Sequence, residues 1–350
     1  MAKKNTRVDY KSAGVNIDAG NEAVERIKAA VHSTYTPAVL SELGGFGSFF
    51  DLSQITKDYI NPVMVQSVDG VGTKIIIARL MNKYDTIGHD LVSACANDIL
   101  VHGARPLTFL DYIANDRLHP EVVEDIVSGI AAACRETGIA LVGGETAEMP
   151  DTYLPGENDL VGIVTGVVER NKIINGSAIE PGDVLIGIES SGLHTNGYSL
   201  ARKLFFEIGK FNVNSHPDDL DSTVGETLLE PHINYTNLVM SLVSSNCNIH
   251  GVAHITGGGF IDNIPRILPK ICAAEIQLGS WKMQPVFPLM QELGNLGSTE
   301  MYRTFNMGIG LVLVVPEVEI ESLLSSIGKS GYQAWRLGGI IPGHRQIHLI

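Results

Sequence analysis

The chain has 350 residues, which is longer than a single hydrophobic core usually grows, so two domains are expected. Its formal net charge of −14 argues against a nucleic-acid backbone as the main partner. No apolar run reaches the roughly 18 residues that a membrane span requires, and the N-terminus lacks the apolar core of a signal peptide, so we expect a cytoplasmic protein with no membrane partner.

The four cysteines lie far apart in the sequence and form no C-x-x-C pair: Cys95, Cys134, Cys247 and Cys272. Each has apolar neighbours, so reduced thiols in the hydrophobic core are expected rather than a disulfide framework or a metal site.

The first 20 residues are polar and contain glycine, and we expect a mobile arm there. Asn21 is a candidate cap for a helix through Val24, Ile27 and Val31, which follow helical spacing. The segment 43–47, Leu-Gly-Gly-Phe-Gly, is a glycine-rich loop. A surface turn and a flap over a ligand are both open interpretations of it.

The segment 62–68 is mostly β-branched and apolar, which predicts a buried strand. It is followed by Asp-Gly-Val-Gly-Thr-Lys at 69–74 and by an apolar segment, 75–81, that predicts a helix. A carboxylate at a strand end can hold Mg²⁺, while glycine amides and a lysine can face an anion. The segment therefore indicates a site for a metal-bound polyphosphate, although it lacks the Walker A spacing. A simple strand-to-helix turn is the alternative.

The segment 88–102 predicts a helix that is apolar nearly all round, interrupted by Asn97 and Asp98. Asp98 shares a face with apolar residues, so its carboxylate should be buried, which is costly unless it is paired or bound to a metal. Pairing with a backbone group or with Arg105 is the alternative to a metal ion.

Further strands are expected at 107–113, ending near Asp111, at 139–142 and at 160–169, with a helix at 120–137 between the first two. The strand at 139–142 is followed by Gly-Gly-Glu-Thr, so a third segment ends in glycines and a carboxylate, Glu145. Carboxylates from separate segments suit Mg²⁺, whereas zinc is not expected because thiols and imidazoles are missing there. Alternating strands and helices predict an α/β layered domain.

A polar segment at 170–182 is the candidate domain boundary. Two glycine-rich stretches follow in the second half, Ser-Ser-Gly-Leu-His-Thr-Asn-Gly at 190–197 and Gly257–Gly259, and each can present backbone amides to a phosphate. A bare tight turn is the alternative for Gly257–Gly259. His250 and His254 are interpreted as structural histidines. The other elements of this half are expected as strands at 184–189, 252–256, 273–278, 308–315 and 333–340 and helices at 198–204, 232–245 and 260–268.

Taken together, nine segments resemble the phosphoribosylformylglycinamidine cyclo-ligase family, the aminoimidazole ribonucleotide synthetases of purine synthesis, in the family's order and over nearly the whole chain. They are DYKSAGVNIDAGN, LGGFG, DGVGTK, ANDI, FLDY, LVGGETAEMP, SSGLHTNGYSLARK, HITGGGFIDNIPR and EMYRTFNMGIG. DGVGTK, the Asn-Asp pair and S-S-G-x-H-x-N-G are shared with a wider superfamily of ATP-using enzymes. LGGFG, GGETAEMP, TGGGF-x-x-N-I-P-R and MYRTFN are much narrower and favour the cyclo-ligases.

The resemblance implies a two-domain α/β (α+β) fold, with residues 1–20 as the arm, 21–171 as an ATP- and Mg²⁺-binding domain and 172–350 as a larger C-terminal domain. The N-terminal sheet would join that of a second copy in a barrel, so a homodimer is expected. The implied reaction is ATP-dependent closure of formylglycinamidine ribonucleotide to 5-aminoimidazole ribonucleotide, in which the formyl amide oxygen is phosphorylated and the ribosyl amidine nitrogen of the same molecule displaces phosphate.

The resemblance also implies roles for individual residues. Magnesium would be bound by Asp69, Asp98 and Glu145, and the reacting groups would be met by Lys74, His194 and Asn196. The substrate's ribose phosphate would be held by Gly257, Gly258 and Gly259. ATP would be contacted by Asp69, Gly70, Gly72, Thr73, Lys74, Asn97, Asp111, Gly143, Gly144 and Glu145.

The chain departs from the family pattern at several positions. Pro-Thr-Arg-Ile-Tyr is expected where residues 231–235 read Pro-His-Ile-Asn-Tyr, and this puts a role for a hydroxyl or guanidinium at that helix start in doubt. Met307 stands where cysteine is common, and residues 66–68 differ before the key Asp69. These last two differences are interpreted as core substitutions.

Four other functions fit the sequence less well. A selenide-activating kinase usually needs a cysteine in its N-terminal glycine-rich segment, and the first cysteine here is Cys95. The related amidotransferase is typically longer or has several subunits, and a thiamine-phosphate kinase would lack the narrow motifs. A non-catalytic nucleotide-binding scaffold would tolerate loss of Asp98, Glu145 or Lys74, and all three are present.

Overall fold

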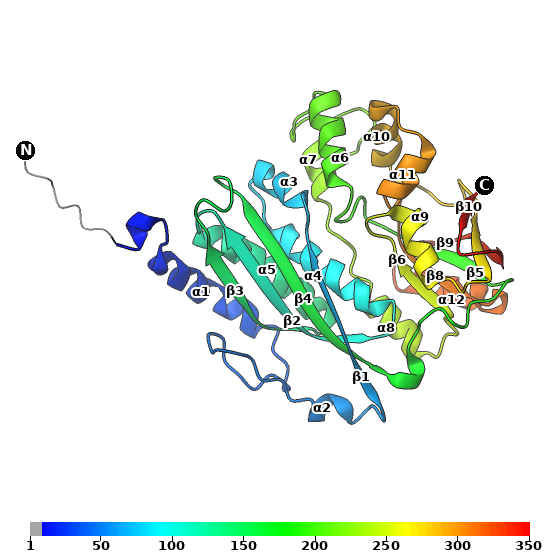
Figure 1. Cartoon of the computed structure of the whole chain (residues 1–350), viewed down its shortest axis with the longest axis horizontal. Coiled ribbons are helices and arrows are strands. Elements are labelled where there is room, and N and C mark those ends of the chain that lie inside the picture. The colour runs from blue at the N-terminus through cyan, green and yellow to red at the C-terminus, as the bar shows by residue number, and fades with distance from the viewer. Residues whose placement is uncertain (1–8) are drawn as a thin grey trace, which may run out of the picture.

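A computed structural model describes residues 9–350, apart from the side chains of residues 54 and 56. The chain forms two sheets, each with its own helices, and the first helix, α1, lies far from the second sheet (Figure 1). None of the helices within the described residues is long and apolar enough to cross a membrane.

The N-terminal sheet has the strand order β1-β4-β2-β3, in which only β2 and β3 are parallel. Helices α4 and α5 cover one face of it, and α1 packs against α5 (Figure 1). The bounds of these elements are α1 Ile17–His32, α2 Ser53–Thr56, β1 Pro62–Gly70, α3 Lys74–Met81, α4 Asp85–Leu100, β2 Arg105–Asn115, α5 Pro120–Thr137, β3 Ala140–Glu148 and β4 Asn158–Glu169.

Two glycines allow α4 and α5 to cross in close contact. A Cβ atom added at Gly88 of α4 would lie 2.0 Å from the carbonyl oxygen of Ile126, and one at Gly129 of α5 would lie 1.8 Å from that of Asp85. Since real Cβ atoms do not approach backbone so closely, only glycine permits this crossing. The close pair then buries the apolar faces of both helices against the sheet.

The second sheet has the order β10-β7-β9-β5-β8-β6, with only β10 and β7 parallel. Strand β8 is buried along its whole length, and β5 is buried except at its last residue. The helical elements here are α6 Tyr198–Arg202, the π-helix η3 Lys203–Ile208, α7 Val224–Leu229, α8 Thr236–Ser244, α9 Gly259–Asn263, η4 Ile264–Ile267, α10 Val286–Gly294, α11 Ser298–Thr304, η5 Glu317–Glu319 and α12 Ile320–Lys329. The strands are β5 Val184–Glu189, β6 Gly251–His254, β7 Cys272–Ile276, β8 Ile309–Val315, β9 Ala334–Pro342 and β10 Ile347–Leu349.

Most of the predicted helices and strands are confirmed, and three differences bear on the site. Helix α1 begins at Ile17, inside the predicted arm, whose residues 1–8 lie outside the described part. Strand β3 continues to Glu148 instead of breaking after residue 142, because it pairs with β2 throughout. Helix α8 begins at Thr236 rather than at 232, since the backbone of 232–235 bonds to side chains of α4.

The division between the domains at residues 171 and 172 stays a prediction. It falls within η2 (Arg170–Lys172), a single turn between β4 and the segment that leads to β5.

Candidate active site

Four positions lie at one level across the N-terminal sheet. Asp69 of β1 is opposite Gly162 of β4, which is opposite Asp111 of β2, which is opposite Gly144 of β3. Neighbouring strands lie ~4.8 Å apart, so β1 and β3 are ~14 Å apart. Glu145 follows Gly144 and therefore points to the other face. Glu145 cannot share one metal ion with Asp69 in this chain, so the predicted three-carboxylate metal site is divided.

The first group of predicted residues lines a cavity of about 790 Å³ beside α1. Asp111, Gly143, Gly144 and Glu145 form part of its wall, and the glycine-rich loop at 43–47 forms another. The predicted loop thus lies at a ligand-sized cavity, as a flap would.

Asp111 is nearly completely buried beside this cavity. Burial raises the pKa of its carboxyl to about 7, which lies far above the usual value. Gly144 has no room for a side chain, because an added Cβ would lie 2.2 Å from Asp111 Oδ1 and 2.8 Å from the Asp111 carbonyl oxygen. The glycine thus permits the close approach of β3 to the Asp111 carboxyl.

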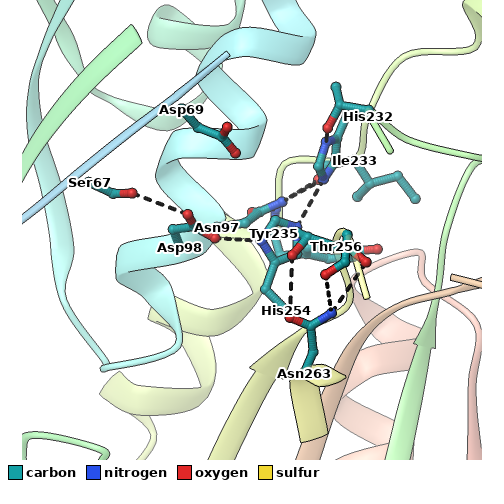
Figure 2. Close-up of polar contacts among 12 residues, drawn as sticks. Ser67, Asp69, Asn97, Asp98, His232, Ile233, Tyr235, His254, Thr256 and Asn263 are labelled. Atoms are coloured by element: carbon teal, nitrogen blue, oxygen red, sulfur yellow. Dashed lines mark hydrogen bonds and ion pairs between the residues drawn. The ribbon is translucent and has the colours of Figure 1, made fainter. Parts of the chain in front are cut away.

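The second group consists of Asp69 and Asp98, which lie near each other between β1 and α4. Asp98 accepts hydrogen bonds from Ser67 Oγ (3.1 Å) and from His254 Nδ1 (2.9 Å) (Figure 2). Asp69 Oδ1 accepts only from the neighbouring backbone N–H of Gly70 among the described bonds (2.8 Å). Among the described residues, Arg105, the alternative partner for Asp98, forms no ion pair with it.

The pKa values of the two carboxyls, Asp69 and Asp98, are shifted in opposite directions. Burial raises the pKa of Asp69, and the negative charge of Asp98 acts in the same direction. Burial also disfavours the charged form of Asp98, but the contacts with His254 and Ser67 outweigh it and lower the pKa of Asp98. The two carboxyls repel each other, and Asp69 Oδ2 has no hydrogen bond among the described residues. This arrangement fits a divalent cation that prefers oxygen ligands, such as Mg²⁺.

Asn97 differs from its predicted role at the nucleotide. Its side chain is completely buried, with Nδ2 donating to the carbonyl oxygen of Ile233 (2.9 Å) and Oδ1 accepting from Tyr235 N–H (3.0 Å) (Figure 2). These bonds tie α4 to the second domain. The amide is therefore used inside the protein and has no free group for ATP.

Lys74 also differs from its predicted role, since its side chain is completely buried. Its Nζ forms an ion pair with Asp90 Oδ2 (2.8 Å) and donates to the carbonyl oxygen of Glu230 (2.7 Å). The ammonium is held away from open space and cannot neutralise a phosphoryl group from this position. Sequence alone pointed to the cation, but not to the buried carboxylate 16 residues later that pairs with it.

The loop that contains Gly72 and Thr73 packs on the predicted substrate loop of the second domain. Gly72 adopts a left-handed φ of 53°, and an added Cβ would lie 3.7 Å from the carbonyl oxygen of Thr195. Thr73 Oγ1 lies 3.2 Å from Ser199 Oγ. The predicted phosphate loop and the predicted substrate loop are therefore neighbours.

His194 and Asn196 belong to the part of the site that the second domain contributes. His194 is buried in a left-handed conformation (φ 62°), its Nε2 accepts from Ser191 N–H (3.2 Å), and its Nδ1 has no partner within the described residues. Asn196 Nδ2 lies 3.5 Å from the position of a Cβ added at Gly257. These predicted residues are thus brought next to the triple glycine.

Gly257 and Gly258 line a cavity of about 410 Å³ together with Arg303 and Thr304. Gly259, by contrast, is buried, and an added Cβ there would lie 2.1 Å from the carbonyl oxygen of Tyr302. Two of the three predicted glycines thus line this cavity, whose wall also includes Asp262 and Glu300, and the Arg303 guanidinium lies 3.8 Å from Asp262 Oδ2.

A further cavity, of about 420 Å³, lies between the two domains. Asp98 and Ser67 contribute to it from the first domain, and His254, Thr256 and Arg266 from the second. His254 had been interpreted as structural, yet it contacts Asp98 directly. The two are 156 residues apart, so no sequence spacing relates them.

Family models and known proteins of one family match nearly the whole chain. Residues 59–168 match the family model "AIR synthase related protein, N-terminal domain", and residues 180–349 match "AIR synthase related protein, C-terminal domain". Proteins named phosphoribosylformylglycinamidine cyclo-ligase are 52% identical over 334 residues in Trichlorobacter lovleyi (95% of both chains) and 46% identical over 343 residues in Alkaliphilus oremlandii (98% of this chain and 100% of that one).

Solved structures share the fold at low identity. The thiamine-monophosphate kinase of Stenotrophomonas maltophilia superposes with a TM-score of 0.70 at 18% identity, covering 94% of this chain and 95% of that one. The hydrogenase maturation protein HypE in complex with ATP gives a TM-score of 0.64 at 17% identity, covering 93% and 90%. From the matched family models and the near-full-length identity to its relatives, the chain belongs to the phosphoribosylformylglycinamidine cyclo-ligase family.

Proposed function

We propose that the cleft between the two domains carries the family's reaction, with a division of roles among the residues described above. The reaction is the ATP-dependent cyclisation of formylglycinamidine ribonucleotide to 5-aminoimidazole ribonucleotide, with ADP and phosphate as the other products. The observation that supports this location is the meeting of Ser67 and Asp98 from one domain with His254 and Arg266 from the other around one cavity. Asp69 lies beside Asp98 (Figure 2).

Asp69 and Asp98 hold Mg²⁺ in this proposal. When bound, Mg²⁺ neutralises charge on the triphosphate oxygens. The support is the chemistry of the two carboxyls: Asp69 has one intrachain hydrogen bond, and its repulsion by Asp98 would be relieved by a cation. Glu145 remains a proposed ligand of a separate metal ion, because it lies on another strand and another face.

ATP occupies the 790 Å³ cavity between α1, the 43–47 loop and β3, with its phosphates directed along the sheet toward Asp69. Asp111, Gly143 and Gly144 contact it there. Gly70, Gly72 and Thr73 contact the phosphates of ATP where these approach the second domain. Lys74 and Asn97 act as positioning residues instead, since their polar atoms bind the chain itself.

The substrate lies on the second domain. Gly257 and Gly258, with Arg303, bind the ribose phosphate through backbone amides and a guanidinium. His194 and Asn196 lie beside the reacting amide. The γ-phosphoryl group is transferred to the amide oxygen, which turns a poor leaving group into phosphate. The amidine nitrogen then forms the C–N bond as the C–O bond breaks, and it loses its proton.

A kinetic assay of ADP and cyclised product tests this proposal. The wild-type protein should form both in equal amounts. Asp69→Asn should lower kcat on the order of 100-fold or more, because the metal loses a charged ligand. Asp58→Asn, an exposed carboxylate outside the cleft, is the matched control and should behave as wild type. ADP without cyclised product would indicate another kinase, and nucleotide binding without turnover a scaffold; either contradicts the proposal.

We also propose a cytoplasmic homodimer, formed through the sheet face that α4 and α5 leave uncovered. Met64 and Val68 of β1 alternate with partly buried positions and are 67% and 63% exposed. Apolar side chains this exposed on one strand face indicate a partner surface. Light scattering of the purified protein should give twice the chain mass of 37.7 kDa, and Met64→Lys with Val68→Lys should lower it.

A further inference from the structure

Arg266 is the one lysine or arginine among the described residues that line the cavity between the two domains. Its guanidinium forms no ion pair and no hydrogen bond with the described part of the chain, whereas Arg336 of the same domain pairs with Glu317 (3.2 Å). A guanidinium carries five N–H donors and keeps its charge at any ordinary pH. The full donor set of Arg266 is therefore available to a ligand in this cavity.

The turn that carries Arg266 is fixed to the triple-glycine loop by a buried amide. Arg266 lies in η4, which directly follows Asn263. Asn263 is 3% exposed, and its Nδ2 donates to the carbonyl oxygens of Gly259 (2.8 Å), Thr256 (3.2 Å) and Gly257 (3.2 Å) (Figure 2). The backbone of the arginine is thus held in place, while its side chain is exposed at the cavity wall.

Asp98 of the N-terminal domain lines the same cavity, of about 420 Å³. Burial opposes the charge of Asp98, but the hydrogen bonds described above and the positive charge of Arg266 lower its pKa. The two side chains nonetheless form no ion pair with each other. A ligand in this cavity therefore meets a carboxylate proposed to hold Mg²⁺ and a guanidinium without a partner among the described residues.

The proposed reaction requires a cation that Lys74 does not supply. A phosphoryl group in transfer spreads its negative charge over three equatorial oxygens. The ammonium of Lys74 is bonded to Asp90 and to the carbonyl oxygen of Glu230, away from the cavity. A planar guanidinium can donate two parallel N–H bonds to two phosphoryl oxygens. Arg266 has the charge and the geometry that the step requires.

We propose that Arg266 is a catalytic residue of phosphoryl transfer, which donates two hydrogen bonds to the γ-phosphoryl group as it passes from ATP to the formyl amide oxygen. The proposal rests on the proposed function of the cleft. In this step the amide oxygen forms the new P–O bond with its own electron pair. The bond from phosphorus to the β–γ bridging oxygen breaks, and its electron pair stays on ADP. Arg266 keeps its protons and its charge throughout.

The ribose phosphate of the substrate is the other anion that a guanidinium in the cleft can bind. In this cavity it would face the Asp98 carboxylate without a metal ion of its own, whereas the γ-phosphoryl group arrives with Mg²⁺. A different arginine, Arg303, lines the proposed ribose-phosphate cavity. Arg266 therefore serves the phosphoryl group, and Arg303 serves the ribose phosphate.

Steady-state kinetics of three glutamine variants tests this division. Arg266→Gln should lower kcat on the order of 1,000-fold, with both KM values little changed, because the lost contact is made in the transition state. Arg303→Gln should instead raise the KM for formylglycinamidine ribonucleotide. Arg336→Gln, an exposed arginine of β9 outside the cleft, is the matched control and should behave as wild type. A raised substrate KM with wild-type kcat in Arg266→Gln would assign Arg266 to the ribose phosphate and overturn the proposal.

Two further readouts separate a lost guanidinium from a lost structure. Guanidinium ion at millimolar concentration should restore part of kcat to Arg266→Ala and leave Arg336→Ala unchanged. Calorimetric titration with ADP, Mg²⁺ and aluminium fluoride, a mimic of the phosphoryl group in transfer, should show tighter binding to the wild type than ADP and Mg²⁺ without fluoride. Arg266→Gln should lose most of this difference and bind ADP and Mg²⁺ as the wild type does. An undiminished difference in Arg266→Gln overturns the proposal.

Failure of the proposed function has a different signature. A wild-type protein that forms no cyclised product contradicts the proposed function, and the aluminium fluoride titration still decides whether Arg266 contacts a phosphoryl group. A wild type that cyclises its substrate, with an Arg266→Gln variant that does so equally fast, leaves the function intact and removes Arg266 from it.

Discussion

Lys74 and Asp90 form an ion pair of 2.8 Å between two side chains that are both completely buried. The pair lies where α3 and α4 meet the second domain, because Lys74 also donates to the carbonyl oxygen of Glu230 and Asp90 accepts from the N–H of His232. A buried charge is tolerated only with its partner. The lysine of the phosphate-loop motif thus fixes the two domains together.

Removal of one charge of this pair should be strongly destabilising. Asp90→Asn leaves the Lys74 ammonium buried without compensation, and we expect a loss of about 3–5 kcal/mol in the free energy of unfolding. Urea denaturation measures this directly. In Lys74→Met combined with Asp90→Leu no charge is buried, and much of the stability should return. A loss below about 1 kcal/mol in Asp90→Asn would contradict a buried pair.

The burial of Asp111 predicts a pH dependence of stability. Its pKa is about 7 in the folded protein and 3.8 in the unfolded chain, so the folded state retains the proton that the unfolded state has already lost. The contribution of Asp111 is therefore fully present below pH 3.8 and is lost as the pH rises to about 7. The difference corresponds to about 4 kcal/mol.

Asp111→Asn should remove this dependence, because an amide does not titrate. Urea unfolding at pH 5 and pH 8 should show the wild type losing stability relative to Asp111→Asn at the higher pH. Equal differences between the two proteins at both pH values would show that Asp111 ionises normally when folded.

Gly144 and Gly143 provide a matched pair for the nucleotide cavity. A methyl group at Gly144 would lie 2.2 Å from Asp111 Oδ1, whereas one at Gly143 would meet only Leu110 Cδ2 at 3.5 Å. Gly144→Ala must move Asp111 or the strand, and we expect ATP affinity to fall at least ~10-fold. Gly143→Ala should lower ATP affinity much less, because neither Asp111 nor the strand has to move. Calorimetric titration with ATP measures both, and similar affinities would place ATP elsewhere.

The burial of the thiols predicts how they react. Cys95, Cys134 and Cys272 are buried, while Cys247 is partly exposed, and none is in a disulfide. Burial raises the pKa of Cys95 and Cys134, which suppresses the reactive thiolate. A thiol reagent should modify Cys247 first in the native protein and all four after unfolding. Rapid native modification of Cys95 would contradict the packing of α4.

The sequence was sufficient for the elements that rest on local pattern. Alternating and continuous apolar runs indicated β1, α4, α5 and β5, and the motif order indicated the family. The structure confirms that these elements exist, and they could be predicted because hydrophobic periodicity and glycine positions act over a few residues. The predicted burial of 62–68 is wrong, since every second residue of β1 is exposed over that segment. The acidic positions Asp69, Asp98 and Asp111 could likewise be identified from the sequence alone, because a carboxylate within or after an apolar segment is unusual.

Only the tertiary structure decided which of these residues can meet. Lys74 is paired with Asp90, and Glu145 faces away from Asp69 because strand order and side-chain alternation place them so. His254 reaches Asp98 across 156 residues of chain. Such contacts depend on how two sheets pack against one another, and no spacing along the sequence encodes that distance.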